Sequence, residues 1–462
     1  MTVEMDYTPL LPGSHRSNIE YSVNYVTYLM ATEDDFRRLD QDMAVSKNDV
    51  EMASQFLSEH HPDVLTGAFG DREKKQELES LLLKFFMERN SGETSPRKIR
   101  AVVNRIVGLD VLEPLVNEEN DIEDISVVAY NNIYLFRKGQ GWVQSNVVFK
   151  TKEDAIQVAH RIAQAAGRSW NHTEPQCVAA FQNIRVQLSG HNMDIDTDVS
   201  ITIRKHSQTL QITEESILSS GQASYELHEF LRYVIRSESR LLVAGTTGAG
   251  KTELFKYMVG LKAEAKKLIL LEEDPEAYLT RHYPSHHISV WRTRDEFDYS
   301  RLLRSALTSR PDFICVQEVK SKEAYQLIKV AQTGHGSIST LHAMNAKQVP
   351  DRMVLMAQEG TDIRKEVLSE MVTDAFDFII YVDLVEGKHR IITEVVEVSH
   401  YNLQTNTYEY RTIFSYDPKT RHHRFVERPS DEQMDRFRTR LNDDEYETLE
   451  GLLHPTEHEV IA

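Results

Sequence analysis

A glycine-rich segment at residues 241–260, LLVAGTTGAGKTELFKYMVG, contains the residue types that cradle phosphate groups. Its spacing is G-x-x-x-x-G-K-[ST], with an apolar, strand-like run before it and a helical pattern after it, which is the context that this motif requires. Glycines let backbone amides turn toward phosphates, and the helix N-terminus adds the positive end of its dipole. Lys251 would reach the β- and γ-phosphates, and the Thr252 hydroxyl would bind magnesium. The predicted nucleotide-binding residues are Gly245, Thr246, Thr247, Gly248, Ala249, Gly250, Lys251 and Thr252.

Acidic side chains end the next two apolar strands along the chain. LILLEEDPEAY ends its strand on Glu272, Glu273 and Asp274, and RPDFICVQEV ends the other on Glu318. Carboxylates at the C-terminal ends of parallel strands, beside a phosphate loop, lie where water and magnesium must be handled. In the following segment, AQTGHGSISTLHAMN, His335 and His342 flank a short strand and could contact a γ-phosphate. An isolated histidine is more often structural, so the role of these two stays open on composition alone.

Alternating strand and helix patterns after residue 223 predict the elements that must hold these residues. Three runs are almost wholly apolar, which is typical of strands buried on both faces of a mostly parallel sheet, so we expect an α/β fold. The runs are Leu241–Ala244, Leu268–Leu271 and Phe313–Val316. The pattern predicts strands over 240–245, 267–272, 312–317 and 336–341, helices over 224–237, 251–264, 299–308 and 321–332, edge strands after 390, and a charged terminal helix over 430–453.

The preceding part of the chain predicts a smaller α+β domain. Helices are expected over 71–89 and 95–107, the second capped by Ser95 with Pro96 at its first position. Strands are expected within 121–150, 184–188 and 199–204, and a helix over 152–166. The predicted division is therefore a partly ordered leader (1–70, with short helices near 33–44 and 48–59), an N-terminal α+β domain (71–205), a polar linker (206–222), a phosphate-loop domain (223–400) and C-terminal strands and helix (401–462).

Composition narrows the functional classes. The chain has 462 residues and a formal net charge of −19, so non-specific coating of nucleic acid is disfavoured. Its two cysteines, Cys177 and Cys315, exclude a disulfide framework and a four-cysteine zinc site. The N-terminal residues lack a signal-peptide pattern, and no apolar run approaches the roughly 20 residues needed to span a bilayer. We therefore expect a cytoplasmic protein.

Taken in order, four boxes resemble those of the type II and type IV secretion and pilus traffic ATPases: the phosphate loop, EEDPEA, LLRSALTSRPDFICVQEV and TGHGSISTLHA. Upstream, GLDVLEPLVNEENDIEDISVVAYNNIYLFRKG, HRIAQAAGRSWNHTEPQCVAAFQNIRVQLSG and SITIRK are similar to the N-terminal domain of the Tad-pilus and conjugative type IV branch. The resemblance covers about residues 72–420. It implies a subunit with an N-terminal α/β domain and a C-terminal RecA-like domain, a homo-hexameric ring, and ATP bound with Mg²⁺ between the two domains.

The resemblance also implies catalytic roles. Glu273 matches the acidic-box glutamate that polarises the attacking water, and Glu318 matches the Walker B glutamate beside the magnesium ion. His342 matches the histidine-box sensor, and Lys251 and Thr252 keep the phosphate and magnesium roles. The predicted catalytic set is thus Lys251, Glu273, Glu318 and His342, with Thr252 and Glu318 serving the metal.

Four arginines match family positions that contact the nucleotide: Arg185 and Arg204 in the N-terminal domain, and Arg304 and Arg310 in the LLR and RPD segments. A mobile domain that brings in an arginine would stabilise the γ-phosphoryl group on closure. The ordinary alternative for Arg204 is a surface ion pair with Asp196 or Asp198.

The chain departs from the family pattern at several positions. Gln317 replaces the usual glycine before the Walker B glutamate, and Lys320 replaces the usual arginine two residues after it. Lysine keeps the charge but loses the bidentate fork. The pair after the histidine box reads Met344-Asn345 in place of Asn-Ser. With two cysteines, the zinc-bearing type II subgroup is excluded.

The expected function is hydrolysis of ATP by a cytoplasmic, magnesium-dependent ring. The ring would lie at the inner face of the cytoplasmic membrane and work with membrane platform or channel proteins of a type IV secretion machine or Tad-like pilus. It would make no direct sequence-specific contact with nucleic acid. Two alternatives stay open: a RecA-like nucleic-acid motor, and a nucleotide-binding ring scaffold with little turnover.

Overall fold

The computed structural model describes residues 45–453 except 90–94, 117–120, 139, 182–183, 192, 194–196, 206–208, 274, 295–296 and 388. The predicted helix over 33–44 lies outside these residues. The chain divides into two compact units, residues 1–206 and 207–462. No helix within the described ranges is both long enough and apolar enough to cross a membrane.

The first unit begins with a helical cluster. Its helices are α3 (Lys47–His60), α4 (Pro62–Leu65), α5 (Arg72–Arg89) and α6 (Pro96–Val107), followed by the 3-10 helix η1 (Asp110–Leu115). Ser95 caps α6 as predicted, because its hydroxyl accepts a hydrogen bond from the Lys98 amide. Leu57 of α3 packs in one core with Leu78 and Leu82 of α5, so residues 45–70, within the predicted leader, are part of this cluster.

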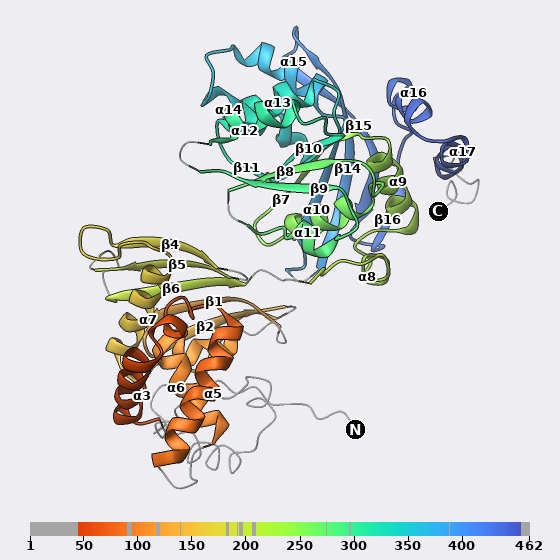
Figure 1. Ribbon diagram of the computed structural model, residues 1–462. Helices are drawn as coiled ribbons and strands as arrows, with labels where there is room; N and C mark the ends of the chain where they lie inside the picture. The colour runs from red at the N-terminus through yellow and green to blue at the C-terminus, as the bar shows by residue number, and fades with distance from the viewer. Residues whose placement is uncertain are drawn as a thin grey trace, which may run out of the picture. The chain divides into compact units, whose positions relative to one another are not determined.

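A six-stranded antiparallel sheet completes the first unit (Figure 1). Its order is β3-β2-β1-β6-β5-β4, and α7 packs on one face. Residues alternate between the two faces: Val186 and Ile203 enter the core, whereas Arg185 and Arg204 lie on the opposite face. The elements are β1 (Ile122–Ala129), β2 (Asn132–Arg137), β3 (Gly141–Gln144), α7 (Lys152–Ala165), β4 (Gln176–Phe181), β5 (Ile184–Gly190) and β6 (Val199–Lys205).

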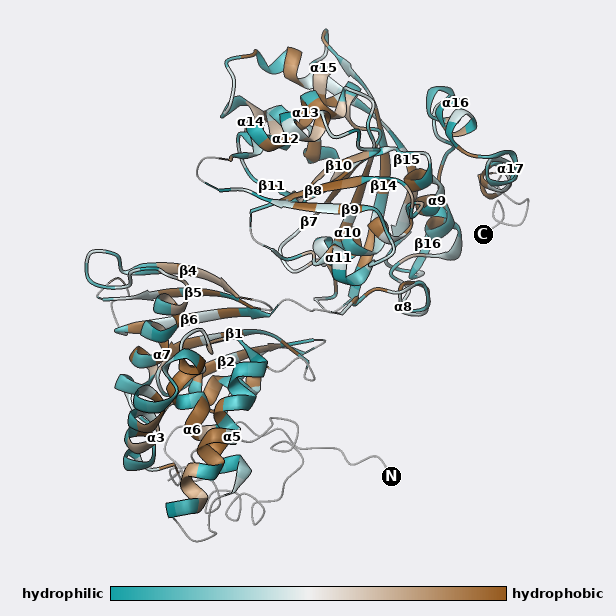
Figure 2. Cartoon of the chain, in the orientation of Figure 1, coloured by the Kyte–Doolittle hydropathy of each residue, from teal (hydrophilic) through white to brown (hydrophobic). Residues whose placement is uncertain are grey.

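The second unit is built on strands whose residues are buried on both faces. Leu242 and Ala244 of β7 join one core, and Leu241 and Val243 join the other. Figure 2 shows these central strands in the brown of hydrophobic residues. The strands are β7 (Arg240–Gly245), β8 (Leu268–Glu272), β9 (Ile288–Arg292), β10 (Phe313–Val316), β11 (Glu318–Val319), β12 (Ser337–His342), β13 (Phe378–Val385), β14 (His389–Asn402), β15 (Thr407–Asp417) and β16 (His422–Phe425).

The pairing of these strands is mixed. The ladders are β10-β8-β9 and β11-β12-β7-β13-β14-β15-β16. β10 and β11 are consecutive pieces of one segment, separated by Gln317, and the first pairs with β8 while the second pairs with β12. The pairs β9-β8, β8-β10, β11-β12, β12-β7 and β7-β13 are parallel. The pairs β13-β14, β14-β15 and β15-β16 are antiparallel. The expectation of a mostly parallel sheet therefore describes only the half that carries the phosphate loop.

Helices flank this sheet (Figure 1). They are α8 (Glu214–Ser219), α9 (Tyr225–Arg236), α10 (Lys251–Gly260), α11 (Leu279–His282), α12 (Tyr299–Leu307), α13 (Glu323–Ala331), η2 (Ala346–Gln348), α14 (Val349–Gln358), α15 (Lys365–Ala375), α16 (Asp431–Arg440) and α17 (Asp443–Leu452). Asn442 caps α17, so the predicted single helix over 430–453 is two helices. Ile217 of α8 is fully buried, so part of the predicted linker is folded into the core.

Candidate nucleotide site

The phosphate loop connects β7 to α10, as its motif predicts (Figure 1). Gly248 and Gly250 take left-handed backbone conformations, with φ of 79° and 89°. Gly245 is required for a different reason, since a Cβ there would stand 2.1 Å from the Val382 carbonyl oxygen. Gly250 is the N-cap residue of α10 and has no side chain to cap it, which leaves the first amides of this helix available to an anion.

Lys251 is 7% exposed, and its ammonium is held by the loop itself. Its Nζ donates to the carbonyl oxygens of Gly245 at 3.2 Å and Thr246 at 3.0 Å. The same nitrogen lies 3.1 Å from Nδ1 of His342. The loop lysine is therefore already bonded to the histidine-box residue.

His342 connects Lys251 to the Walker B carboxylate. Its Nε2 lies 3.1 Å from Oε1 of Glu318, so an imidazole protonated at Nε2 donates to that carboxylate and accepts from Lys251 at Nδ1. Burial acts to raise the pKa of Glu318, but the hydrogen bond from His342 and the charge of Lys320 outweigh it and lower the pKa to about 2. Glu318 is therefore ionised at neutral pH.

Lys320 extends the contacts to the acidic box. Its Nζ lies 3.1 Å from Oε2 of Glu318 and 3.6 Å from Oε2 of Glu273. Glu318 is the less exposed of the two acids, with 26% of its side chain accessible against 59% for Glu273. All four predicted catalytic residues, Lys251, Glu273, Glu318 and His342, thus belong to one run of contacts, which Lys320 completes.

A third acidic residue, Glu272, is buried next to Glu273 in the chain. Glu272, at the end of β8, is 2% exposed and accepts hydrogen bonds from the amides of Ala277 at 2.9 Å and Glu276 at 3.3 Å. Burial raises the pKa of Glu272 to about 7, despite these hydrogen bonds. The sequence predicts only that Glu272 lies at a strand end. The apolar strand before it does not show which of the two adjacent glutamates, Glu272 or Glu273, turns toward the core.

Gln317 occupies the break between β10 and β11. Its backbone amide donates to the carbonyl oxygen of Leu271 at 3.0 Å, and its carbonyl oxygen accepts a hydrogen bond from the Thr340 hydroxyl at 2.6 Å. Its side-chain amide donates to Oε2 of Glu276 at 3.2 Å. The glutamine thus links the Walker B segment to the acidic-box loop through a contact that a glycine could not make.

Two residues beyond the predicted set hold the phosphate loop. The Thr246 hydroxyl donates to Oδ1 of Asp383 at 2.9 Å. Nε of Arg390 donates to the Gly248 carbonyl at 3.1 Å, and its Cδ lies 2.9 Å from where a Cβ on Gly250 would stand. Both come from the hairpin β13–β14, more than 130 residues after the loop, so no local sequence signal could identify them.

The two N-terminal arginines lie side by side in the first unit. Arg185 of β5 and Arg204 of β6 are register partners, and Arg204 is also the register partner of Asp124 on β1. Nε of Arg204 donates to Oδ1 of Asp124 at 2.9 Å, with 56% of the arginine side chain exposed. The surface-pair alternative for Arg204 named nearby acids such as Asp196 or Asp198, and the ion pair described for this arginine is with Asp124.

Asp198 pairs with Lys152, and Asp196 lies outside the described residues.

The remaining predicted residues do not join the run of contacts. Arg304 and Arg310 are exposed. In the described part of the chain, neither makes a hydrogen bond or ion pair with the side chains that run from Lys251 to Glu273. His335 lies before β12 and contacts the Thr333 hydroxyl at 2.7 Å, whereas His342 ends the same strand. Of the two histidines, only His342 is therefore beside the loop.

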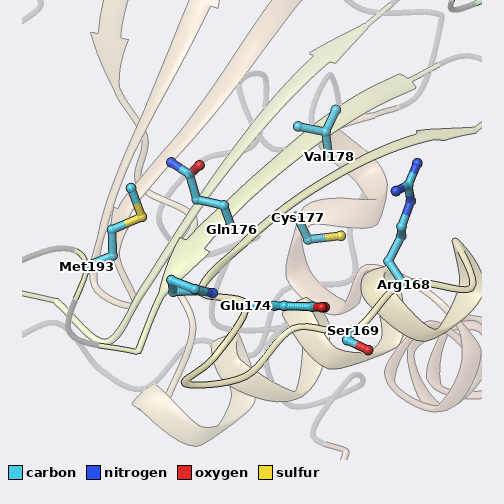
Figure 3. A pocket seen from close by; sticks show the side chains of 8 residues that line it. Arg168, Ser169, Glu174, Gln176, Cys177, Val178 and Met193 are labelled. Carbon is cyan, nitrogen blue, oxygen red and sulfur yellow. The ribbon is translucent and has the colours of Figure 1, made fainter.

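A pocket of about 400 Å³ lies elsewhere, beside the edge strand β4 (Figure 3). Most of its lining residues are exposed, and none is a predicted site residue. They are Arg168, Ser169, Glu174, Pro175, Gln176, Cys177, Val178 and Met193. In Figure 3 the Arg168 side chain extends away from Gln176 and Met193, so the polar groups do not converge on a common ligand position.

Comparison with known proteins identifies relatives over the same region. A family model described as "Type II/IV secretion system protein" matches residues 119–386, more than half of the chain. An uncharacterised protein of Bacillus anthracis is 24% identical over 332 residues, covering 70% of this chain and 73% of that protein. The type IV secretion system protein VirB11 of Bartonella quintana is 29% identical over 190 residues, covering 39% of this chain and 52% of VirB11.

Among solved structures, the VirB11 ATPase of the Brucella suis type IV secretion system, determined with sulphate, is 25% identical and has a TM-score of 0.34. That similarity covers 62% of this chain and 92% of the crystallised chain. The match to Bartonella VirB11 spans about half of that relative's length. The resemblance stated from the sequence is confirmed by the family model, and the VirB11 matches agree with its conjugative type IV branch.

Proposed function

Because this chain belongs to the type II/IV secretion system protein family, we propose that it hydrolyses ATP to drive a type IV secretion machine or a Tad-like pilus. The observation that carries the proposal is the contact run from Lys251 through His342 to Glu318 beside the phosphate loop. It joins a phosphate-binding cation, a candidate γ-phosphate sensor and an ionised carboxylate, which are parts that phosphoryl transfer uses.

The triphosphate would lie along the loop Gly245–Thr252, over the first amides of α10. Lys251 would exchange its bonds to the Gly245 and Thr246 carbonyls for bonds to the β- and γ-phosphates. That exchange would also release the imidazole of His342 from Lys251, so a γ-phosphate could take the ammonium's place at Nδ1 only if that nitrogen is protonated. His342 would therefore report occupancy of the loop by a change in its hydrogen bonding.

The residues present suit magnesium. Mg²⁺ prefers oxygen ligands, and the Thr252 hydroxyl and the ionised Glu318 carboxylate supply them next to the phosphate position. The ammonium of Lys320 between Glu318 and Glu273 shows that this point of the site attracts a cation. When bound, the metal would neutralise charge on the phosphates. Glu273, the more exposed carboxylate, would orient the attacking water and take its proton.

The domain division 71–205 and 223–400, and the RecA-like nature of the second part, belong to the same proposal. Arg185, Arg204, Arg304 and Arg310 would contact the nucleotide, the first two from the N-terminal domain. The working form would be a homo-hexamer at the cytoplasmic face of the membrane, in contact with platform or channel proteins. The family membership and the matches to VirB11 support these assignments.

Steady-state ATP turnover by the purified full-length chain tests the proposal. We expect Mg²⁺-dependent phosphate release and a hexameric mass by light scattering in the presence of nucleotide. Nucleotide binding without turnover at saturating Mg²⁺ would instead favour the ring scaffold. The specific observation behind that second candidate is Lys320, which sits where the metal-handling carboxylates meet.

A further inference from the structure

Lys320 is a cation held between the two acids of the candidate site. Its Nζ lies 3.1 Å from Glu318 and 3.6 Å from Glu273, and these acids come from different segments, the β11 strand and the loop after β8. Two carboxylates facing one position repel each other unless a positive charge lies between them. The ammonium therefore offsets the negative charge of the two carboxylates, as a metal ion would at the same position.

The backbone of this segment is fixed independently of the lysine side chain. The amides of Lys320 at 2.5 Å and Ser321 at 2.9 Å both donate to Oε1 of Glu323, which is itself only 9% exposed at the start of α13. The Lys320 side chain, in contrast, is 43% exposed. Four methylene groups thus separate an anchored backbone from a solvent-accessible ammonium, so this group can leave the acids without disturbing the fold.

We propose that the Lys320 ammonium occupies the place of a divalent cation between Glu273 and Glu318, and that metal-bound nucleotide must displace it. The proposal rests on the proposed function and deepens it by assigning a positioning role to Lys320. The proposal means that the protein without nucleotide does not collect free divalent metal, because the negative charge of the two acids is already balanced. Metal would enter with the phosphates, whose added charge shifts the competition toward the doubly charged ion.

A lysine suits this exchange better than an arginine. An arginine could bind one of the carboxylates through two parallel hydrogen bonds, which together hold it more strongly than a single contact. The lysine offers one compact charge on a flexible stem and contacts both acids at ordinary ion-pair distances. Lysine in place of the family's usual arginine at position 320 therefore provides a counter-charge that is easily displaced.

Binding of Mn²⁺ to the full-length protein without nucleotide tests the proposal. The probe is the electron paramagnetic resonance signal of free Mn²⁺, which falls as the ion binds. We expect Lys320→Met to bind Mn²⁺ at least about tenfold more tightly than the parent. The matched control is Lys322→Met, an exposed lysine two residues on, which should leave the affinity unchanged. Thermal melts establish that each variant is folded, and Lys320→Gln repeats the test with a polar side chain.

Equal Mn²⁺ affinity in the parent, Lys320→Met and Lys320→Gln would overturn the proposal. Weaker metal binding in the Lys320 variants would also overturn it, because Lys320 would then support the metal and not replace it. The gain should vanish in the double variant Lys320→Met/Glu318→Gln. Fluorescent ADP binding, compared between the parent and Lys251→Ala, separately tests whether the phosphate loop binds nucleotide at all. Failure of that test refutes the proposed function, whatever the Mn²⁺ result.

Discussion

His342 is the register partner of Gly245 in the parallel ladder between β12 and β7. The last residue of one strand thus stands directly beside the first glycine of the phosphate loop, which brings the imidazole within 3.1 Å of the Lys251 ammonium. The histidine box is therefore positioned by backbone hydrogen bonding, and its place does not depend on a long or flexible connection. A change in the conformation of the phosphate loop should therefore alter the hydrogen bonding of His342.

Replacing Lys251 by alanine should abolish ATP turnover. The substitution removes the charge that the β- and γ-phosphates require, and it also removes a hydrogen-bond donor to His342. The measurement is phosphate release at saturating ATP and Mg²⁺, with Lys322→Met as the control for an exposed lysine. A variant that hydrolyses ATP at the parental rate would place the catalytic site elsewhere.

Glu318→Gln should retain ATP while losing turnover. The amide keeps the shape of the carboxylate but loses the charge that balances Lys320 and a metal ion. Single-turnover kinetics with radiolabelled ATP would show bound, uncleaved nucleotide. If Glu318→Gln still turns over while Glu273→Gln is inactive, the base is Glu273 alone.

Arg204→Ala should lower kcat by at least about tenfold, some 1.4 kcal/mol in the activation free energy, while ATP still binds. The Arg204 side chain is 56% exposed in its ion pair with Asp124, so the thermal midpoint should stay close to that of the parent. Asp124→Asn is the matched control, since it breaks the same pair and keeps the arginine. Unchanged kcat in Arg204→Ala would make the N-terminal arginine a surface residue with no part in catalysis.

Glu272 should make stability depend on pH. Folding raises its pKa to about 7 from an ordinary 4.5, so the folded state binds this proton more tightly than the unfolded state. The stabilisation is complete below about pH 4.5 and is lost as pH rises through about 7, an upper bound of about 3 kcal/mol. Denaturant unfolding of Glu272→Gln should therefore show a smaller decline between pH 5 and about pH 8 than the parent. If the free energy of unfolding falls equally with pH in the parent and in Glu272→Gln, Glu272 is not the source of the pH dependence.

The loop glycines should differ in their tolerance of a methyl group. Gly245→Ala places a Cβ 2.1 Å from the Val382 carbonyl oxygen and should cost several kcal/mol or prevent folding. Gly248→Ala meets no atom within 4 Å and carries only the strain of its φ of 79°, about 1 kcal/mol. Comparing the two thermal midpoints checks this order, and a less stable Gly248→Ala would contradict it.

The parts of the site that share a local pattern could be predicted from the sequence. The loop is recognisable because its strand, glycines and helix are contiguous. His342 ends a short strand, whereas Glu318, expected at the end of an apolar strand, begins β11 two residues after β10 ends. Glu273 and Lys320 could be named as positions, but their approach to a common point depends on which strands pair. Periodicity does not show that β10 pairs with β8 while β11 pairs with β12.

Other features were beyond prediction because distant packing decides them. Arg390 and Asp383 reach the loop only because β13 lies next to β7. The strand β4 and the helices α14 and α15 were not predicted, and the mixed order of the large sheet departs from the parallel pattern that the apolar strands suggested. Strands buried on both faces look alike in sequence whether their neighbours are parallel or antiparallel.

The long strand β14 has a mechanical consequence. Near its start Arg390 bonds to the Gly248 carbonyl, and seven residues along Glu397 accepts a hydrogen bond from the backbone amide of Ser430, the cap of α16. Seven residues of strand span about 23 Å, and a hydrogen-bonded strand stretches little. Movement of the loop would therefore be passed along β14 to α16, and the register shift between Val395 and Val396 is the point within this span at which the strand can bend.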